Sequence, residues 1–139
     1  MARALVDTGA VVALINRADR HHAAAVEWFK RFRGQLLTTE AVVTETAYVL
    51  AASPAHLRAA LLWFERARAA GLLKVEPVAD YAALARIMAQ YDNLPCDYAD
   101  ASLIALAERA GVTAIATIDQ RDFSIYRIRG RRRFRLVLA

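Results

Sequence analysis

Four acidic residues that are far apart in the chain stand where the local pattern favours another residue type. Asp7 ends the apolar run "ALVD", and Asp119 ends a second such run, "AIATID". At 100° per residue, Glu45 falls inside the apolar arc of its predicted helix, beside Val49, and Asp100 shares a helix face with leucine, isoleucine and alanine. An inward carboxylate without a partner is costly, so each of these acids needs one.

Each acid also has a purely structural explanation. Asp7 would cap the helix that follows it, Glu45 would pair with one of the many arginines, and Asp119 would form a turn. Asp97 and Asp100 are three residues apart at a predicted helix start, which is the spacing of a capping box. That role explains Asp97 well and Asp100 less well, because the helix face of Asp100 is otherwise apolar.

If these acids meet at one place, their chemistry follows from their charge. Four carboxylates within a few ångströms repel one another and do not all ionise unaided. A divalent cation removes the conflict, and oxygen ligands suit Mg²⁺ or Mn²⁺ better than zinc. Such an ion activates a water molecule and neutralises charge on a phosphoryl group. The sequence therefore predicts hydrolysis of a phosphodiester, with nearby hydroxyl donors at Thr8, Thr39 and Thr117.

Short apolar runs that alternate with helical patterns would bring the acids together. We expect helices at 9–17, 21–34, 40–53, 55–70, 79–91 and 98–111, and strands at 3–7, 35–39, 72–78, 112–119 and 134–138. This alternation predicts an α/β fold, in which a parallel sheet of about five short strands lies between helices. Ligands of such sheets bind beyond the carboxyl ends of the strands, where Asp7 and Asp119 stand.

The composition predicts one packed domain over residues 1–139. Hydrophobic residues make up 58% and charged residues 24%, so we expect a core and not disorder. No apolar stretch approaches the roughly 18 residues that span a bilayer. The N-terminus lacks a signal-peptide pattern, and the single Cys96 fits a reducing compartment. We therefore expect a cytoplasmic protein without a membrane partner.

The net charge of +5 is concentrated near the end of the sequence. Segment 127–135, "RIRGRRRFR", holds six arginines and no acid, and without them the net charge changes from +5 to −1. This segment is either a solvated end of the molecule or a contact for a phosphate backbone or an acidic partner.

Four segments, in the same order as in the family, resemble the PIN-domain ribonucleases and especially the VapC-type toxins of toxin–antitoxin pairs. They are "LVDTGAVVALINRAD", "TTEAVVTETAYVL", "YADASLIALAER" and "ATIDQRDF". The resemblance implies a five-stranded α/β/α sandwich and RNA cleavage that depends on Mg²⁺ or Mn²⁺. It places the family's four catalytic acids on Asp7, Glu45, Asp100 and Asp119, and we expect Asp7, Asp100 and Asp119 to hold the metal.

The resemblance also implies partners. These are an RNA substrate, a second copy of the chain in a homodimer, and a small antitoxin that inserts an arginine into the acidic pocket. Trp28, Trp63 and Tyr48 lie at helical spacing among apolar residues, and we expect them in the core or at the dimer interface rather than under RNA bases.

Two other functions stay open at this point. A non-cleaving RNA-binding or regulatory domain would keep the acids for a metal or a partner arginine without turnover. A phosphatase would use Asp7 as its nucleophile. Phosphoaspartate enzymes that carry a second acid two residues after the nucleophile would need an acid at position 9, where this sequence has Gly9. We predict a ribonuclease, since all four family acids are present.

Overall fold

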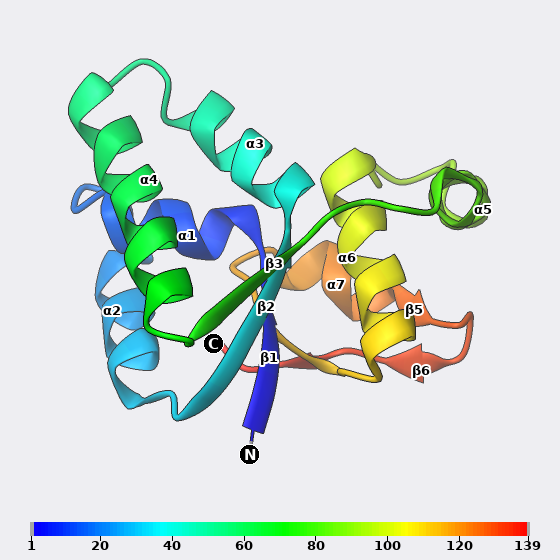
Figure 1. The fold of residues 1–139 in the computed structure, drawn as a ribbon. Helices are drawn as coiled ribbons and strands as arrows, with labels where there is room; N and C mark the ends of the chain where they lie inside the picture. Colours follow the sequence, from blue (N-terminus) through cyan, green and yellow to red (C-terminus); the bar gives the residue numbers. More distant parts are fainter. Residues whose placement is uncertain (1, 139) are drawn as a thin grey trace.

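The computed structural model describes residues 2–138. Its centre is a five-stranded sheet with the strand order β3-β2-β1-β4-β7, in which neighbouring strands pair in parallel (Figure 1). The strands are β1 (Ala2–Val6), β2 (Gly34–Thr39), β3 (Leu73–Glu76), β4 (Ala114–Ala116) and β7 (Arg135–Leu136). The predicted parallel sheet of five short strands is confirmed.

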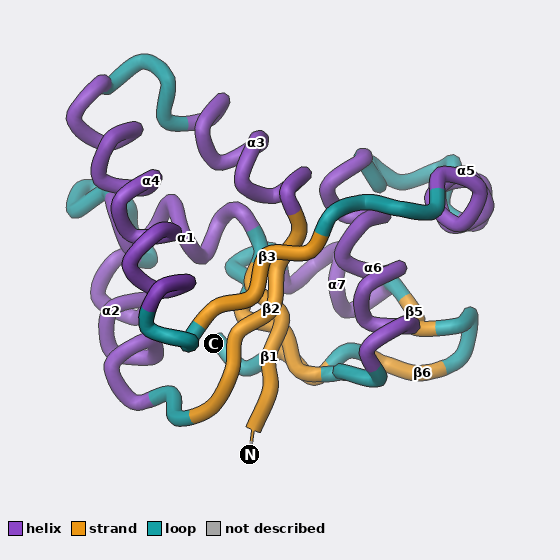
Figure 2. Tube along the Cα trace, in the orientation of Figure 1, coloured by secondary structure: helices purple, strands orange, loops and turns teal. Residues whose placement is uncertain are grey.

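Helices cover both faces of this sheet (Figure 2). One face packs against α1 (Thr8–Ile15), α2 (His22–Arg31) and α4 (Pro54–Ala69). The other packs against α5 (Tyr81–Gln90), α6 (Tyr98–Ala110) and α7 (Gln120–Ile125). Helix α3 (Glu40–Val49) begins directly after β2, beyond the edge where the strands end. Within residues 2–138, no helix is long and apolar enough to cross a membrane.

The central strands are apolar because both of their faces are covered. Along β1, Ala4 and Val6 belong to the core on one side of the sheet, and Leu5 between them belongs to the core on the other side. Side chains of a strand alternate between its two faces, so a strand that is buried on both sides needs apolar residues at every position. The chain therefore leaves the core only at the strand ends.

Two predicted boundaries are wrong for reasons of local chemistry. The helix predicted over 40–53 ends at Val49, and Ser53 and Pro54 begin the next helix instead. The Ser53 hydroxyl accepts a hydrogen bond from a backbone N–H of α4, and proline suits the first helical position. The strand predicted over 112–119 stops at Ala116, because the next residues turn toward α7.

The segment after Asp119, for which we predicted no element before 134, contains three short ones. Helix α7 is followed by a hairpin of β5 (Arg127–Ile128) and β6 (Arg132–Arg133), which pair in antiparallel register. The chain then enters the sheet as β7, beside β4. The arginine-rich segment 127–135 is thus an ordered part of the fold, next to α6 (Figure 1).

Candidate active site

Four helices begin at the carboxyl edge of the sheet, and an oxygen-bearing side chain caps each of them. In each case the side-chain oxygen accepts a hydrogen bond from the first turn, at 2.8–3.3 Å; the capping residues are Asp7, Thr39, Asp97 and Asp119. The capping roles expected for Asp7 and Asp97 are therefore correct, and Asp119 is also a cap. These capping roles do not exclude a functional site, because helix N-termini that converge attract negatively charged groups.

Asp7 is the most constrained of these acids. It is 6% exposed, and both of its carboxylate oxygens accept hydrogen bonds. Oδ1 accepts from the backbone N–H of Thr8 at 2.8 Å, and Oδ2 accepts from the Thr117 hydroxyl at 2.9 Å. Burial, with smaller contributions from the charges of Asp119 and Asp97, raises the pKa of Asp7 to about 6 despite these bonds. Asp119 therefore lies within electrostatic reach of Asp7.

Asp100 lies on the buried face of α6, as the sequence predicted. It is 9% exposed, and its Oδ2 accepts a hydrogen bond from the buried Tyr126 hydroxyl at 3.0 Å. Burial raises the pKa of Asp100 to about 8, with the nearby charges of Asp7 and Asp97 adding to the effect. Asp100 and Asp7, 93 positions apart in the sequence, thus share one electrostatic environment.

Glu45 joins the same group from α3, but the helical-wheel argument for it was wrong in detail. Val49, which we placed beside it on the apolar arc, is 52% exposed, and the buried stripe of α3 continues through Val42, Thr46 and Leu50. Glu45 is half-buried at the border of that stripe. Burial raises its pKa to about 7, and the neighbouring Asp97 carboxyl adds to the shift.

Within residues 2–138 these acids have no cationic partner. Among the ion pairs of residues 2–138, none involves Asp7, Glu45, Asp100 or Asp119. The alternative in which Glu45 pairs with an arginine is therefore wrong for the structure as described. Burial, with the charges of neighbouring carboxylates adding to it, raises the pKa values of Asp7, Glu45 and Asp100.

The donor set fits a hard divalent cation. It consists of carboxylate oxygens together with Thr8 Oγ1, which is buried and has no hydrogen-bond partner in the described chain. No three acidic, histidine or cysteine side chains within residues 2–138 are yet arranged as a closed metal cluster. An ion held by three of these carboxylates therefore requires a change in their arrangement.

The expected hydroxyl donors differ in their roles. Thr117 does donate to Asp7, as described above. Thr39 instead shares a hydrogen bond of 2.7 Å with Ser102 and caps α3, so its hydroxyl is used within the fold. Cys96 is buried, and burial raises the pKa of its thiol to about 11, so it is protonated at neutral pH and unsuited to nucleophilic chemistry.

Gly9 contributes to the site through its lack of a side chain, which sequence reasoning missed. A Cβ at this position would lie 2.6 Å from Cγ1 of Ile118, well inside van der Waals contact. Ile118 directly precedes Asp119, so the close approach brings the first turn of α1 against the segment that carries Asp119. Gly9 thereby helps to hold Asp7 and Asp119 near each other.

Replacing Gly9 with alanine will lower the free energy of unfolding by about 1–3 kcal/mol, as is usual for overpacking. Adding Ile118→Ala removes the clashing atoms, so the double variant will be more stable than the sum of the two single effects predicts. Urea denaturation of the four proteins of this cycle measures the coupling. Strict additivity would show that the two positions are independent.

Comparison with known proteins identifies the family to which this chain belongs. The model of the PIN domain family matches residues 4–129, and the chain is a member of that family. It is similar to ribonuclease VapC26 of Mycobacterium tuberculosis (strain ATCC 25618 / H37Rv), with 30% identity over 133 residues that cover 96% of this chain and 98% of the relative.

A solved structure supports the fold independently. The crystal structure of Mycobacterium tuberculosis VapC20, described as a toxin that cleaves the sarcin–ricin loop, superposes with a TM-score of 0.74. The match covers 86% of this chain and 92% of VapC20, at 23% sequence identity. The predicted family and fold are thus confirmed.

Proposed function

We propose that this chain is a metal-dependent endoribonuclease that acts as the toxin of a toxin–antitoxin pair. The observation that carries the proposal is the convergence of Asp7, Glu45, Asp100 and Asp119 at the carboxyl edge of a PIN-domain sheet, where no ion pair of residues 2–138 involves any of them. The similarity to ribonuclease VapC26 supports cleavage of RNA as the reaction. RNA as substrate implies action in the cytoplasm.

In this proposal Asp7, Asp100 and Asp119 hold Mg²⁺ or Mn²⁺. The bound ion would supply an activated water molecule and neutralise charge on the phosphoryl group. The hydroxyls of Thr117 and Tyr126 fix the orientation of the Asp7 and Asp100 carboxylates. Glu45 lies outside the metal set, and its pKa of about 7 suits a general base that accepts a proton near neutral pH.

The test is incubation of the purified protein with ribosomal and transfer RNA in Mg²⁺ or in EDTA. A hairpin that contains the sarcin–ricin loop, the target named for VapC20, is a suitable defined substrate. We expect fragments in Mg²⁺ and intact RNA in EDTA. RNA binding without fragments would favour the non-cleaving alternative, and hydrolysis of a small phosphate ester with intact RNA would favour the phosphatase.

Replacing Tyr126 with phenylalanine will lower kcat/KM for RNA by about 10- to 100-fold, the range typical of a lost hydrogen bond to a metal-binding group. The hydroxyl of Tyr126 lowers the pKa of Asp100, so its loss will move the acidic limb of the pH–rate profile to higher pH. Tyr91→Phe is the matched control, because the Tyr91 hydroxyl bonds the backbone of Arg127 instead. A Tyr126→Phe profile that superposes on the wild-type profile would contradict this role.

The antitoxin proposed here would reach the acids through an adjacent cavity. This cavity of about 380 Å³ lies between α3 and the start of α6 and is lined by Glu45 and Asp97 together with apolar and aromatic side chains. An arginine-bearing apolar segment complements both features. Its arginine would pair with acids that have no ion pair in the described part of the chain, and its apolar side chains would pack on the apolar lining. The antitoxin's arginine would then neutralise the acids in place of the metal.

The proposed homodimer would bury the exposed apolar side chains of two neighbouring helices. Tyr48 and Val49 on α3 are 82% and 52% exposed, and Leu61 and Leu62 on α4 are also exposed. Trp28 and Trp63, by contrast, pack in the core on one face of the sheet. Tyr48 is therefore the member of the predicted aromatic set that is exposed enough to anchor a second copy, and it stands where this surface borders the cavity proposed for the antitoxin.

Replacing Tyr48 with glutamate will shift the mass in light scattering from that of a dimer toward the monomer mass of 15.4 kDa. A buried charge at the centre of an interface is strongly unfavourable, which is the reason for this expectation. Tyr81→Glu is the control, because Tyr81 is 71% exposed on α5, a different part of the surface. A monomeric wild-type protein would refute the dimer.

A further inference from the structure

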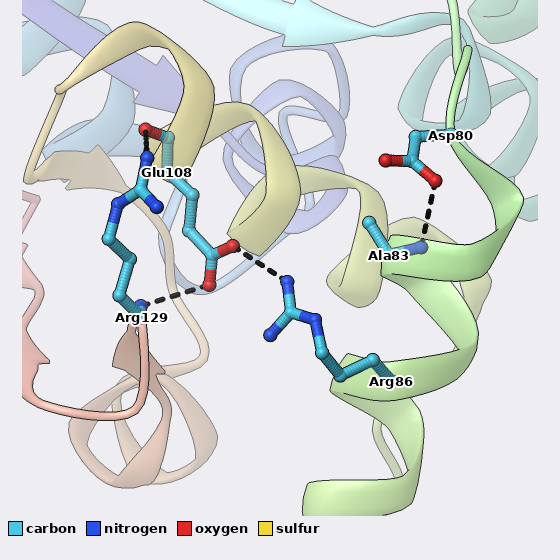
Figure 3. Close-up of polar contacts among 5 residues, drawn as sticks. All are labelled: Asp80, Ala83, Arg86, Glu108 and Arg129. Carbon is cyan, nitrogen blue, oxygen red and sulfur yellow. Dashed lines mark hydrogen bonds and ion pairs between the residues drawn. The ribbon is translucent and has the colours of Figure 1, made fainter.

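Glu108, near the end of α6, organises a group of arginines outside the acidic site (Figure 3). Its Oε1 accepts a hydrogen bond from Arg86 Nη2 of α5 at 3.0 Å. Its Oε2 accepts from the backbone N–H of Arg129 at 2.9 Å, and its backbone carbonyl accepts from Arg129 Nη2 at 3.1 Å. One glutamate thus ties both α5 and the β5–β6 hairpin to α6.

The turn of this hairpin is held in an unusual conformation. Arg129 has φ = 54° and Gly130 has φ = 70°, and the N–H of Arg131 donates to the carbonyl of Ile128 at 3.1 Å. A two-residue turn with both φ values positive favours asparagine and glycine, and arginine is rare in it. The two hydrogen bonds from Arg129 to Glu108 compensate for that strain, so the hairpin has a fixed position on α6.

The fixed hairpin presents cationic side chains to solvent. Arg131 and Arg132 are exposed and form no ion pair within residues 2–138. Together with Arg129 they line a cavity of about 340 Å³ at the end of α6. Arg127 is different, because its guanidinium donates to three carbonyls at the end of α7 and is structural.

A second cavity of about 340 Å³ lies on the other side of Glu108, between α5 and α6. Arg86, Arg109 and Arg129 line it, and it extends to Thr39 at the carboxyl end of β2. We call the two cavities together the arginine surface, defined by Arg86, Arg109, Arg129, Arg131 and Arg132. Two acids, Asp80 and Glu108, line this surface, and the Glu108 carboxylate is already bonded to Arg86 and to the backbone N–H of Arg129.

The arginine surface is close enough to the acidic site for one RNA strand to contact both. Asp100 and Glu108 are on the same helix, eight positions apart, which corresponds to about 12 Å along the helix axis. At about 3.4 Å per nucleotide of a stacked strand, that distance is a few nucleotides. An RNA strand cut at the acids would therefore reach the arginines without bending far.

RNA also needs such a surface, because the acidic site repels phosphates. Outside segment 127–135 the chain has no excess of positive charge that would offset this repulsion. A protein partner fits less well, since protein interfaces centre on exposed apolar side chains and none of the large exposed apolar residues lines either cavity. Phosphates need only the cations.

We propose that the arginine surface binds backbone phosphates of the RNA strand that flanks the cleaved bond. This inference rests on the proposed ribonuclease function and adds the surface that holds the substrate. Arg131 and Arg132 are its most accessible members, and Glu108 is a positioning residue that fixes the hairpin.

The experiment measures binding of a fluorescent single-stranded RNA of 20 nucleotides at several salt concentrations. The proteins carry Asp7→Asn, so that Mg²⁺ is present without cleavage. Each phosphate contact contributes about 0.7 to the slope of log K against log salt for a single strand. Replacing Arg131 and Arg132 with alanine will therefore reduce the slope by about 1.4. The matched control, Arg31→Ala with Arg66→Ala on α2 and α4, removes the same charge elsewhere and will leave the slope unchanged.

The outcomes separate this inference from the proposed function. If the wild-type protein cleaves RNA and the Arg131/Arg132 variant keeps the full slope, the arginine surface is not an RNA contact. An equal loss of slope in the control would show that RNA responds to the total charge of the protein and not to these arginines, and it would also overturn the inference. Unchanged RNA binding with weakened antitoxin binding would assign the surface to a protein partner. If the wild-type protein cleaves no RNA at all, the proposed function itself fails.

Discussion

Replacing Asp100 with asparagine will lower RNA cleavage by at least about 10³-fold while the protein stays folded. Asparagine has nearly the same shape and still accepts the hydrogen bond from Tyr126, so the change removes charge and little packing. The expected loss exceeds the 10- to 100-fold typical of a supporting hydrogen bond, because the carboxylate itself is proposed to hold the cation. Single-turnover cleavage in Mg²⁺, with circular dichroism as the check on folding, measures it.

Asp19→Asn is the matched control for this variant. Asp19 accepts a hydrogen bond from a backbone N–H, that of His21 at 2.8 Å, as the site aspartates do at their helices, but it belongs neither to the acidic group nor to the arginine surface. Its replacement will change the cleavage rate by less than about twofold. Asp7→Asn and Asp119→Asn will behave like Asp100→Asn. An Asp100→Asn protein that cleaves RNA at the wild-type rate would remove Asp100 from the mechanism.

Without divalent cations, the carboxylates of the site will make the folded protein less stable at pH 8 than at pH 5. The pKa values of Asp7 and Asp100 are raised to about 6 and about 8 in the folded state. Between pH 4 and pH 8 the folded state therefore holds protons that the unfolded chain has released, so the free energy of unfolding falls as pH rises. For Asp7 alone the loss between pH 5 and pH 8 is on the order of 1 kcal/mol, because about one pKa unit of its shift lies above pH 5, at about 1.4 kcal/mol per unit.

Urea denaturation in EDTA at several pH values measures this effect, and Asp100→Asn provides the reference. Contributions of other groups that titrate in this range cancel in the difference between the two proteins. The wild-type protein will lose more stability than the variant as pH rises, and Mg²⁺ at pH 8 will restore more of it in the wild type. Parallel stability curves for the two proteins would show that the Asp100 carboxyl is not destabilised by its surroundings.

The fold and the main acids could be predicted because they depend on local pattern and topology. Strands buried on both faces must be apolar throughout, so a carboxylate at the end of one, such as Asp7, is conspicuous in the sequence. Parallel strands then bring their carboxyl ends to one edge. The inward face of Asp100 followed from helical periodicity, because Leu103, Ile104 and Ala107 on that face are indeed buried.

The remaining features depend on contacts between distant segments, which periodicity does not report. Tyr126 reaches Asp100 across 26 positions, and Gly9 matters only because Ile118 lies against it. A helical wheel also does not distinguish an apolar residue of the core from one on an exposed patch. Val49 is of the second kind, so its position on the wheel did not show that Glu45 points into the core. The elements between 120 and 133 are two to six residues long, too short for a repeating pattern.

The central claim is that Asp7, Asp100 and Asp119 together hold a divalent cation. Anomalous diffraction from crystals grown with Mn²⁺ tests it most directly, because it locates the ion without reference to activity. We expect one or more anomalous peaks among these three carboxylates, at about 2.0–2.3 Å from their oxygens. A protein that cleaves RNA with Mn²⁺, but whose crystals show manganese only elsewhere on its surface, would contradict the account.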